Sequence, residues 1–184
     1  MTRIFDFIFS FLGLVLFSPI FLVLLVIGYF DTGSPIFLQE RVGRCKKAFR
    51  LIKFRSMHVN TPSVATHFAS ASSITSFGSF LRKSKLDELP QLWNVFVGDM
   101  SLVGPRPNLF NQEELIHERD SRGVYSVRPG ITGLAQINKI DMSTPQLLAE
   151  TDTQMIQELN TLGYFKYIFL TLFGKGFGDR IKKE

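Results

Sequence analysis

Residues 84–107, with the sequence SKLDELPQLWNVFVGDMSLVGPRP, organise the rest of the chain. Pro90 predicts a helix start, because proline is tolerated only in the first turn of a helix, where its missing N–H has no intrahelical partner. Apolar residues recur after it at helical spacing, and Gly98 predicts where the helix ends. The acidic pair Asp87 and Glu88 is therefore expected on the first turn. Free N–H groups and the helix dipole stabilise negative charge there by roughly 0.3 to 1 kcal/mol, so the aspartate is expected to stay ionised as a nucleophile or a metal ligand.

The same segment ends in a rigid arginine. Arg106 stands between Pro105 and Pro107, which restrict the backbone on both sides. A guanidinium held in this way suits a phosphate, because its planar fork donates two parallel hydrogen bonds. From residue types alone, however, the plainer interpretation of the two preceding acids is a pair that caps the helix and has no chemical role.

The full string resembles the signature of the monotopic phosphoglycosyl transferases, the bacterial sugar transferase family. In that signature an Asp-Glu pair precedes Pro-Gln-Leu, and Gly-Asp-Met-Ser and Pro-Arg-Pro follow, as they do here. The resemblance also covers KFRSM at residues 53–57, RPGITGLAQ at residues 128–136 and, more loosely, the N-terminal hydrophobic segment. It extends over nearly the whole chain, and such a combination is far more specific than any single motif.

The resemblance implies a particular reaction. A UDP-sugar donates its sugar 1-phosphate to polyprenol phosphate, with undecaprenyl phosphate as the expected lipid, releasing UMP and starting assembly of a surface glycan such as the O-antigen of lipopolysaccharide. By the same resemblance, Asp87 attacks the phosphate next to the sugar and forms a covalent aspartyl phosphosugar, which the lipid phosphate resolves. Mg²⁺ would neutralise the diphosphate, since it binds carboxylate and phosphate oxygens together, and the family analogy offers Asp87 as its protein ligand. Glu88 would position the metal or manage the proton on the lipid phosphate.

The resemblance also suggests substrate contacts. The candidates for phosphate and nucleotide binding are three arginines, a lysine and a loosely matching acid: Arg82, Arg106, Arg128, Lys53 and Asp152. The chain departs from the common pattern after RPGITGLAQ, where Asn138-Lys139-Ile140 replaces the frequent Asn-Gly-Arg. The resemblance therefore leaves the identity of the sugar undetermined.

The composition indicates a membrane-associated protein. The 184 residues suffice for one domain with a sizeable core, and 19 phenylalanines are a heavy apolar load for a soluble domain of this size. The net charge is +5, and residues 1–30 contribute nothing to it, because Arg3 and Asp6 cancel. A neutral apolar head on a basic body favours an anionic membrane surface or a phosphate-rich substrate. Charge alone also fits nucleic acid, but the resemblance implies no nucleic-acid partner, and a homodimer is left open.

Residues 7–30 form an uncharged hydrophobic stretch of 24 residues, about 36 Å long as a straight helix against a hydrocarbon core of about 30 Å. Alone, that length predicts a transmembrane helix. A kink is expected at its middle, because Pro19 removes a backbone hydrogen bond and Ser18 can bond back to a preceding carbonyl. The residues leave open a kinked spanning helix and a re-entrant hairpin that returns to the same face. The family resemblance favours the re-entrant hairpin.

The expected organisation is a re-entrant membrane helix at residues 1–30 and a membrane-associated catalytic domain at residues 31–184. A basic cluster follows the hydrophobic stretch, and cytoplasmic flanks of membrane segments are enriched in such residues. The catalytic domain is therefore expected on the cytoplasmic face, in the bacterial inner membrane. The cluster consists of Arg41, Arg44, Lys46 and Lys47.

The catalytic domain is predicted to belong to the α/β (α+β) class, with a β-hairpin and several helices, some of them interfacial. Residues 35–42 and 48–57 are rich in Phe, Ile, Leu and Val and flank the turn GRCKK, which predicts the hairpin. Strand alternation puts Lys53 and Arg55 on one face. The helices are expected at residues 77–84, 112–119 and 144–160, and the charges of the second are interpreted as a solvated face.

Two further segments carry weaker patterns. Residues 60–76, dominated by Ser, Thr and Ala, predict a loop. The tail, residues 164–177, is too short to span a bilayer and too apolar for a free surface helix, so docking at the membrane interface is expected, with the basic residues at the very end beside it. The alternative for the tail is a terminal helix packed on the domain core.

Two other functions stay open at this level. The same apolar and basic composition would suit a non-enzymatic, membrane-peripheral binding module in which the acids only cap a helix. An ordinary metal-dependent glycosyltransferase is the third candidate. The released nucleotide separates the three, since a phosphoglycosyl transferase releases UMP, a glycosyltransferase releases UDP, and a binding module releases neither.

Overall fold

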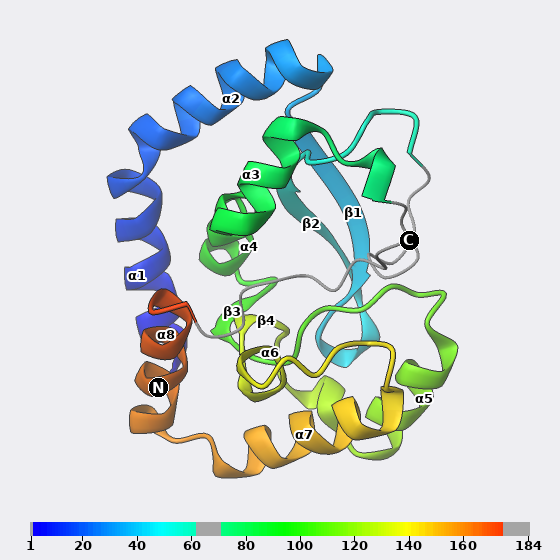
Figure 1. The fold of residues 1–184 in the computed structure, drawn as a ribbon. Helices are drawn as coiled ribbons and strands as arrows, with labels where there is room; N and C mark the ends of the chain where they lie inside the picture. The colour runs from blue at the N-terminus through cyan, green and yellow to red at the C-terminus, as the bar shows by residue number, and fades with distance from the viewer. Residues whose placement is uncertain (1, 62–70, 175–184) are drawn as a thin grey trace.

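The computed structural model describes residues 2–61 and 71–174, whose arrangement Figure 1 shows. A long bent arm of two helices runs along one side of a body that contains a β-hairpin, a short strand pair and the remaining helices. The predicted mixed α+β class is confirmed. The helices and strands are α1 (Thr2–Leu16), α2 (Ser18–Thr32), β1 (Ile36–Val42), β2 (Ala48–Phe54), α3 (Ser76–Ser84), α4 (Gln91–Val97), β3 (Ser101–Val103), α5 (Glu113–Ser121), β4 (Gly130–Thr132), α6 (Leu134–Ile137), α7 (Pro145–Glu158) and α8 (Thr161–Leu172), with short 3₁₀ turns η1 (Arg44–Lys46), η3 (Ala71–Ser73), η4 (Leu86–Glu88) and η5 (Val124–Ser126).

The predicted kink at Ser18 and Pro19 is confirmed. The helices α1 and α2 meet at an angle of 61°, with Pro19 in the first turn of α2. The Ser18 hydroxyl donates to the carbonyl of Val15 at 2.8 Å, which is the carbonyl that proline leaves without its helical partner. Within the described residues no single helix has the length and hydropathy needed to cross a membrane, whereas α1 and α2 together meet both requirements as a bent pair.

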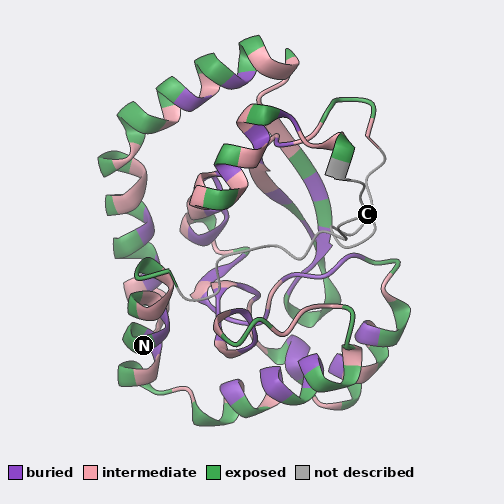
Figure 2. Ribbon diagram, viewed as in Figure 1, coloured by how far each residue is buried: buried purple, intermediate pink, exposed green. Residues whose placement is uncertain are grey.

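The arm leaves many apolar side chains exposed along its outer side (Figure 2). Leu16 at the bend is 72% exposed and Leu22 just beyond it is 65% exposed. Each helix has 15 residues and is therefore about 22 Å long, less than the hydrocarbon core of about 30 Å. Apolar surface of this extent marks a membrane or interaction surface.

Two charged side chains fasten the start of α1 to the body. Arg3 donates hydrogen bonds to the last carbonyls of α4. The Asp6 carboxylate is only 2% exposed and accepts hydrogen bonds from the Ser101 hydroxyl, the Leu102 N–H and the Tyr164 hydroxyl at 2.9, 2.9 and 2.8 Å. These two charges, which cancel in the sequence, therefore fix α1 against α4, β3 and α8.

The end of α2 is fastened to the same body. Asp31, near its C-terminus, accepts a hydrogen bond of 2.7 Å from the Thr75 hydroxyl. The same hydroxyl caps α3 by accepting from the Gly78 N–H at 2.8 Å. Gly78 in turn lies so close to β2 that a Cβ atom there would stand 2.0 Å from the carbonyl oxygen of Ser56. The arm therefore leaves the body at α1 and returns to it at α2.

The predicted hairpin is confirmed, with β1 and β2 paired antiparallel over all seven residues of each strand. Asn94 docks α4 onto the edge of this hairpin. Its side chain accepts from the N–H of Ile52 at 3.0 Å and donates to the carbonyl of Arg50 at 2.8 Å. Because a free strand edge has unpaired N–H and C=O groups, the amide of Asn94 takes the place of a third strand and fixes α4 relative to β2.

The acids Asp87 and Glu88 do not lie on the first turn of α4, as the sequence predicts, but in the separate 3₁₀ turn η4 that precedes it. The reason is that Pro90 cannot donate to the carbonyl of Leu86, so the N–H of Leu89 bonds that carbonyl instead, in a 3₁₀ contact of 3.2 Å. On the other side of the turn, Lys85 ends α3 in a left-handed conformation with φ of 57°.

The predicted end of α4 at Gly98, with φ of 100°, is confirmed.

A parallel strand pair joins the segment before Pro105-Arg106-Pro107 to the segment after Arg128-Pro129. β3 pairs with β4, and neither strand is predicted from the sequence. At the end of this pair Gly104 and Gly130 are in such close contact that a Cβ on Gly130 would lie 2.0 Å from the backbone nitrogen of Gly104. Gly133 also lies close to this pair, because a Cβ there would lie 2.7 Å from the carbonyl oxygen of Gly104.

The remaining predicted helices are confirmed as α3, α5 and α7. The loop predicted at residues 60–76 contains η3 and the first residue of α3, and its residues 62–70 lie outside the described part. The apolar tail forms α8, and the alternative of a helix packed on the core is confirmed for its inner face, whereas docking at the membrane interface stays a prediction. Its inner face packs on the core through the buried rings of Tyr164 and Tyr167, beside Phe5 of α1, while Phe169 and Leu172 are 59% and 75% exposed. The basic residues from Lys175 onward lie outside the described residues.

Candidate active site

One face of the hairpin carries polar side chains into the candidate site. Alternation along the paired strands puts Gln39, Arg41 and Lys53 on the same face. The Lys53 ammonium and the Arg55 guanidinium lie 5.4 and 5.3 Å from the ring centre of Phe37. The prediction that these two cations share a face is confirmed.

Lys53 lies among the charges that the sequence assigns to the site. Burial lowers the pKa of its ammonium group to about 8, and the positive charges of Arg41, Arg82 and Arg106 lower that pKa further, whereas Asp87 raises it. Charges influence one another this way over distances up to about 10 Å. The structure therefore brings together Lys53, Arg82, Arg106 and Asp87 around the end of β2.

Glu88 and Arg106 form an ion pair beside this cluster, with Arg106 Nη2 3.2 Å from Glu88 Oε1. Both side chains remain in contact with solvent, at 16% exposure for Glu88 and 35% for Arg106. Asp87, the preceding residue, is only 7% exposed. The η4 turn thus directs one carboxylate to the guanidinium and holds the other in a more enclosed position near Lys53.

Arg41 is a site residue that the sequence interpretation missed, because it was assigned to the basic flank of the membrane segment. Its side chain is buried, and that burial, together with the nearby charge of Arg106, lowers its pKa to about 10, while Glu88 opposes the shift. The guanidinium donates to the Gln39 side chain at 2.5 and 3.1 Å and to the carbonyl of Pro107 at 3.1 Å. Strand alternation with Lys53 was the signal that could have found it.

Arg82 is held by the packing of α3 against β2. Its Nε donates to the hydroxyl of Ser56 at 2.8 Å. Because Gly78, one turn earlier, allows the helix backbone to touch Ser56, the last turn of α3 brings Arg82 to the end of β2. There the charge of Arg82 contributes to lowering the pKa of Lys53.

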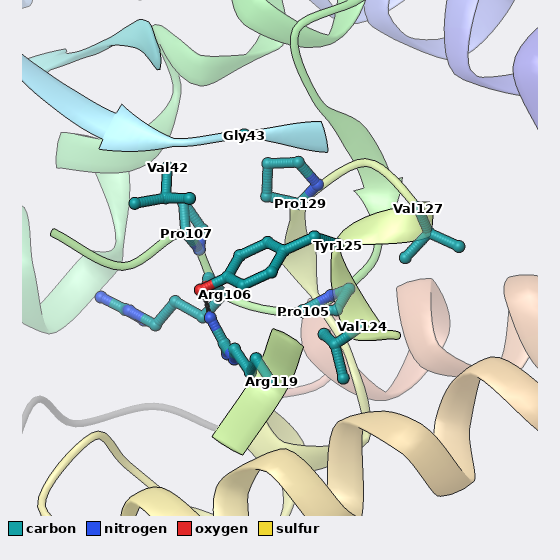
Figure 3. Close-up of a pocket in the computed structure, with 10 residues that line it drawn as sticks. All are labelled: Val42, Gly43, Pro105, Arg106, Pro107, Arg119, Val124, Tyr125, Val127 and Pro129. Atoms are coloured by element: carbon teal, nitrogen blue, oxygen red, sulfur yellow. Dashed lines mark hydrogen bonds between the residues drawn. The ribbon is translucent and has the colours of Figure 1, made fainter. Parts of the chain in front are cut away.

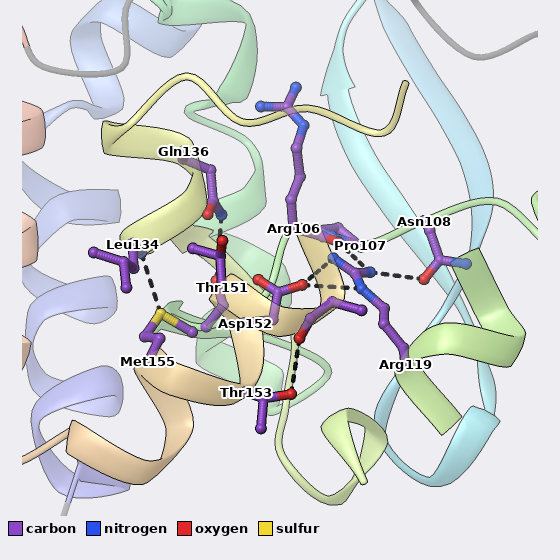
Figure 4. Close-up of polar contacts among 12 residues, drawn as sticks. Arg106, Pro107, Asn108, Arg119, Leu134, Gln136, Thr151, Asp152, Thr153 and Met155 are labelled. Atoms are coloured by element: carbon purple, nitrogen blue, oxygen red, sulfur yellow. Dashed lines mark hydrogen bonds and ion pairs between the residues drawn. The ribbon is translucent and has the colours of Figure 1, made fainter. Parts of the chain in front are cut away.

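Asp152 occupies a different position from the one expected of a substrate contact. Its carboxylate is 0% exposed and accepts two hydrogen bonds, of 3.0 and 2.7 Å, from the guanidinium of Arg119 (Figure 4). Burial raises the pKa of Asp152, and the charge of Arg119 opposes that rise. In this structure Asp152 therefore contacts Arg119 in the core instead of facing a substrate.

The position of Arg119 differs from the one expected for the charged residues of α5. The charges of the α5 segment were interpreted as a solvated face, but Arg119 is 1% exposed. Besides Asp152, it contacts the carbonyl of Arg106 and the Asn108 side chain, both at 2.9 Å. The hydroxyl of Tyr125 donates to the same Asn108 oxygen at 3.1 Å. No pattern in the sequence links these residues, because Arg119 is 13 residues from Arg106 and 33 residues from Asp152.

A small pocket lies beside the Arg106 loop (Figure 3). Its volume of about 10 Å³ has room for about one water molecule, so it is too small for a nucleotide sugar. The lining residues are Val42, Gly43, Pro105, Arg106, Pro107, Arg119, Val124, Tyr125, Val127 and Pro129.

The sequence pattern of the bacterial sugar transferase family matches residues 1–176. The chain belongs to this family. Among similar proteins, the UDP-glucose:undecaprenyl-phosphate glucose-1-phosphate transferase of Klebsiella pneumoniae is 41% identical, over 95% of this chain and 40% of that protein. The UDP-N-acetylgalactosamine-undecaprenyl-phosphate N-acetylgalactosaminephosphotransferase of Aeromonas hydrophila is 36% identical, over 95% of this chain and 44% of that protein.

The relatives that the chain matches differ in length. The exopolysaccharide production protein ExoY of Rhizobium meliloti (strain 1021) is 34% identical over 92% of this chain, and the match covers 83% of that protein. By contrast, the chain spans 32% to 44% of the length of six of the curated relatives that it matches.

Arg128 lies away from the acids. Its Nε donates to the carbonyl of Gly98 at 2.7 Å, at the C-terminal end of α4, whereas Asp87 and Glu88 precede the N-terminal end. The seven residues of α4 separate the two positions by about 10 Å. The structure therefore brings four of the predicted basic and acidic contacts together and places Arg128 at the opposite end of the same helix.

Asp87 and Glu88 are the carboxylates of the candidate site that could supply oxygen ligands to a metal ion. Within the described ranges, no group of three or more His, Cys, Asp or Glu side chains is placed to hold a metal ion. Mg²⁺ commonly binds one or two carboxylates and completes its shell with water and substrate phosphates. Asp87 can supply such a carboxylate, with Glu88 adjacent but already bonded to Arg106.

Proposed function

We propose that this protein is a phosphoglycosyl transferase that moves a sugar 1-phosphate from a UDP-sugar to polyprenol phosphate, with undecaprenyl phosphate as the lipid, and so starts assembly of a surface glycan. The observation that carries the proposal is the enclosed carboxylate of Asp87, located near Lys53 and next to the Glu88–Arg106 ion pair. The names of the Klebsiella and Aeromonas relatives, which specify such transfers to undecaprenyl phosphate, support it.

The proposed reaction proceeds by two displacements at one phosphorus atom. First, a carboxylate oxygen of Asp87 attacks the phosphorus that bears the sugar. The bond from that phosphorus to the oxygen bridging the diphosphate breaks, and UMP leaves with the electron pair. Second, an oxygen of the lipid phosphate attacks the same phosphorus and releases the Asp87 carboxylate, which gives the polyprenol diphosphate sugar.

The neighbouring side chains supply the electrostatics that this chemistry needs. Arg106 and Lys53 would bind the donor phosphates, because phosphoryl transfer depends mainly on positioning and on stabilising charge at the phosphate oxygens. Glu88 orients the Arg106 guanidinium through their ion pair. A bound Mg²⁺, held by Asp87, would neutralise charge on the diphosphate.

The test is turnover by the purified protein in detergent with a panel of UDP-sugars, polyprenol phosphate and Mg²⁺. The proposal expects release of UMP together with a polyprenol diphosphate sugar for at least one donor. Release of UDP would indicate an ordinary glycosyltransferase, and turnover of none of the donors would favour the membrane-peripheral binding module. Either result would contradict the proposal.

We further propose that the arm is a re-entrant hairpin, and that the body lies on the cytoplasmic face of the bacterial inner membrane. What supports this topology is that both ends of the arm are bonded to one body, through Arg3 and Asp6 at one end and Asp31 and Thr75 at the other. The apolar surface between those ends is exposed, and each helix is too short to cross alone.

Single cysteines at Thr2 and Thr32, each in a Cys45→Ser background, test this topology in intact cells. Both cysteines should be protected from an impermeant thiol reagent and become reactive only after the cells are opened. Labelling of the residue 2 cysteine from the periplasm would contradict the hairpin. Replacing Ser18 and Pro19 by leucines should straighten the arm and shift the population toward such labelling.

The pKa of Lys53 predicts a pH dependence of donor binding. With a pKa lowered to about 8, Lys53 is charged below that pH and becomes neutral above it, so the KM for the UDP-sugar should rise as the pH passes from 7 to 9. Lys53→Arg should remove most of this rise, because a guanidinium stays charged over the whole range. The measurement is KM against pH for both proteins, and superimposable profiles would argue against a contact between Lys53 and the donor.

A further inference from the structure

The loop that carries Arg106 is fastened through its carbonyl groups. Because Pro105 and Pro107 lack an N–H, this loop has few donors of its own and depends on donors from elsewhere. Four consecutive carbonyls each accept a hydrogen bond, and the donors come from three other parts of the chain, namely β1, α5 and the start of β4. The donors are the Gly130 N–H to Pro105 at 2.8 Å, Arg119 Nη1 to Arg106 at 2.9 Å, Arg41 Nη1 to Pro107 at 3.1 Å and the Val42 N–H to Asn108 at 2.9 Å.

Arg119 is the donor that reaches Arg106 itself. Its side chain is sealed in the core at 1% exposure, so it cannot touch a substrate. Two of its nitrogens bond the same carboxylate oxygen of Asp152, while Nη1 is shared between the Arg106 carbonyl and Asn108. Because a guanidinium is planar and rigid, the bonds to Asp152 fix the direction in which Nη1 points.

Figure 4 shows that the pair reaches only the backbone of Arg106, whose side chain extends away from Arg119 and Asp152. At its other end that side chain bonds Glu88 at 3.2 Å. A displacement of the Arg106 carbonyl would therefore shift the Arg106 backbone, and with it the guanidinium, relative to the acids. Misplacement of about 1 Å can cost about 100-fold in rate.

The pair is also an inefficient way to stabilise a core. The second oxygen of Asp152, Oδ1, is buried without a hydrogen-bond partner among the described residues. Buried ion pairs pay a large desolvation cost, and their replacement by apolar residues of similar size is often neutral or stabilising. A role in placing the loop accounts for the pair better than a role in stability does.

We propose that Arg119 and Asp152 are positioning residues, which hold the backbone of Arg106 so that its guanidinium meets Glu88 and the donor phosphates. This inference rests on the proposed function for its catalytic consequence. The contact with the Arg106 carbonyl, however, can be tested without any turnover.

The test variant carries Arg119→Met together with Asp152→Leu, which removes both buried charges and leaves no unpaired one. It should keep a cooperative melting transition, while amide hydrogen exchange in residues 104–112 rises at least about 10-fold. With UDP-sugar as the varied substrate, kcat/KM should fall about 10-fold. In an Arg106→Ala background the same double change should alter kcat/KM by less than about 2-fold, because its effect acts through the missing side chain.

Tyr167→Ala on α8 provides the control for a general loss of stability. Tyr167 is a buried residue outside the Arg119 network, so this variant should lower Tm without raising exchange in residues 104–112. Wild-type exchange in those residues for the test variant would overturn the proposal, as would an equal loss of kcat/KM with and without Arg106. If the wild-type protein turned over no donor, the proposed function alone would fail, and the exchange measurement would still decide whether the pair holds the loop.

Discussion

Asp87→Asn is expected to lower the steady-state rate of UMP release by at least about 1,000-fold. In the proposed mechanism the attacking oxygen belongs to an ionised carboxylate, and an amide oxygen is a far poorer nucleophile. A loss of that size corresponds to about 4 kcal/mol of transition-state stabilisation. The rate should be measured with saturating UDP-sugar and polyprenol phosphate, and added Mg²⁺ should not restore it.

Two matched variants define what the loss means. Glu88→Gln keeps the nucleophile and removes only the charge that pairs with Arg106, so a slow first step should remain. Asp120→Asn changes an exposed carboxylate that pairs with Lys46 and should leave the rate unchanged. An Asp87→Asn protein that retained more than a tenth of the wild-type rate would exclude Asp87 as the nucleophile.

Arg106→Lys is expected to lower kcat/KM for the UDP-sugar by about 100-fold, although it conserves the charge. Lysine is a point charge without the planar fork that binds two phosphate oxygens at once. It also cannot bond Glu88 and a phosphate with the same fixed geometry, so the ion pair of 3.2 Å would be lost or would compete with the substrate. Steady-state kinetics with the donor as the varied substrate measures this effect.

The control for this change is Arg122→Lys. Arg122 also pairs with carboxylates, those of Glu118 and Glu150, but it lies directly after α5 and not beside η4. Its kinetics should match those of the wild type. Near-normal activity of Arg106→Lys with an unchanged donor KM would remove Arg106 from the phosphate site.

Local patterns predicted most elements of this fold, because the physical cause of each is contained in a few neighbouring residues. Pro19 removes one helical hydrogen bond, and the arm bends there by 61°. Gly98 accepts a left-handed conformation, and α4 ends at it. The turn GRCKK lies between two apolar runs, which pair over residues 36–42 and 48–54.

Contacts between distant segments could not be predicted in this way. The pairing of Arg119 with Asp152 joins α5 to α7. Polarity suggested that the first faces solvent, and the family resemblance suggested that the second contacts a substrate. The strands β3 and β4 have three residues each, too few for a periodic pattern. The position of the acids was predicted one element too late, because Pro90 was taken to allow a single continuous helix, whereas its missing N–H favours a separate 3₁₀ turn.

Arg41 illustrates a signal that was present but interpreted differently. Its charge fits the basic flank of a membrane segment, and its register in β1 places it on the same face as Lys53. The register of β1 determines where Arg41 lies, because the face that it shares with Lys53 packs inward and buries the Arg41 side chain. Sequence reasoning therefore proposed the acids and several cations that lie near them as candidates, but not the buried arginines that hold the loop around them.

The central claim is covalent catalysis by Asp87, and the most direct measurement of it is the intact mass of the protein after incubation with a UDP-sugar and Mg²⁺ in the absence of lipid. The wild-type protein should gain the mass of one sugar phosphate, at a site that peptide mapping assigns to Asp87, and should lose it when polyprenol phosphate is added. Asp87→Asn should gain nothing. An adduct that persists in Asp87→Asn, or robust turnover with ternary-complex kinetics and no trapped adduct, would contradict the mechanism and leave Asp87 as a metal ligand only.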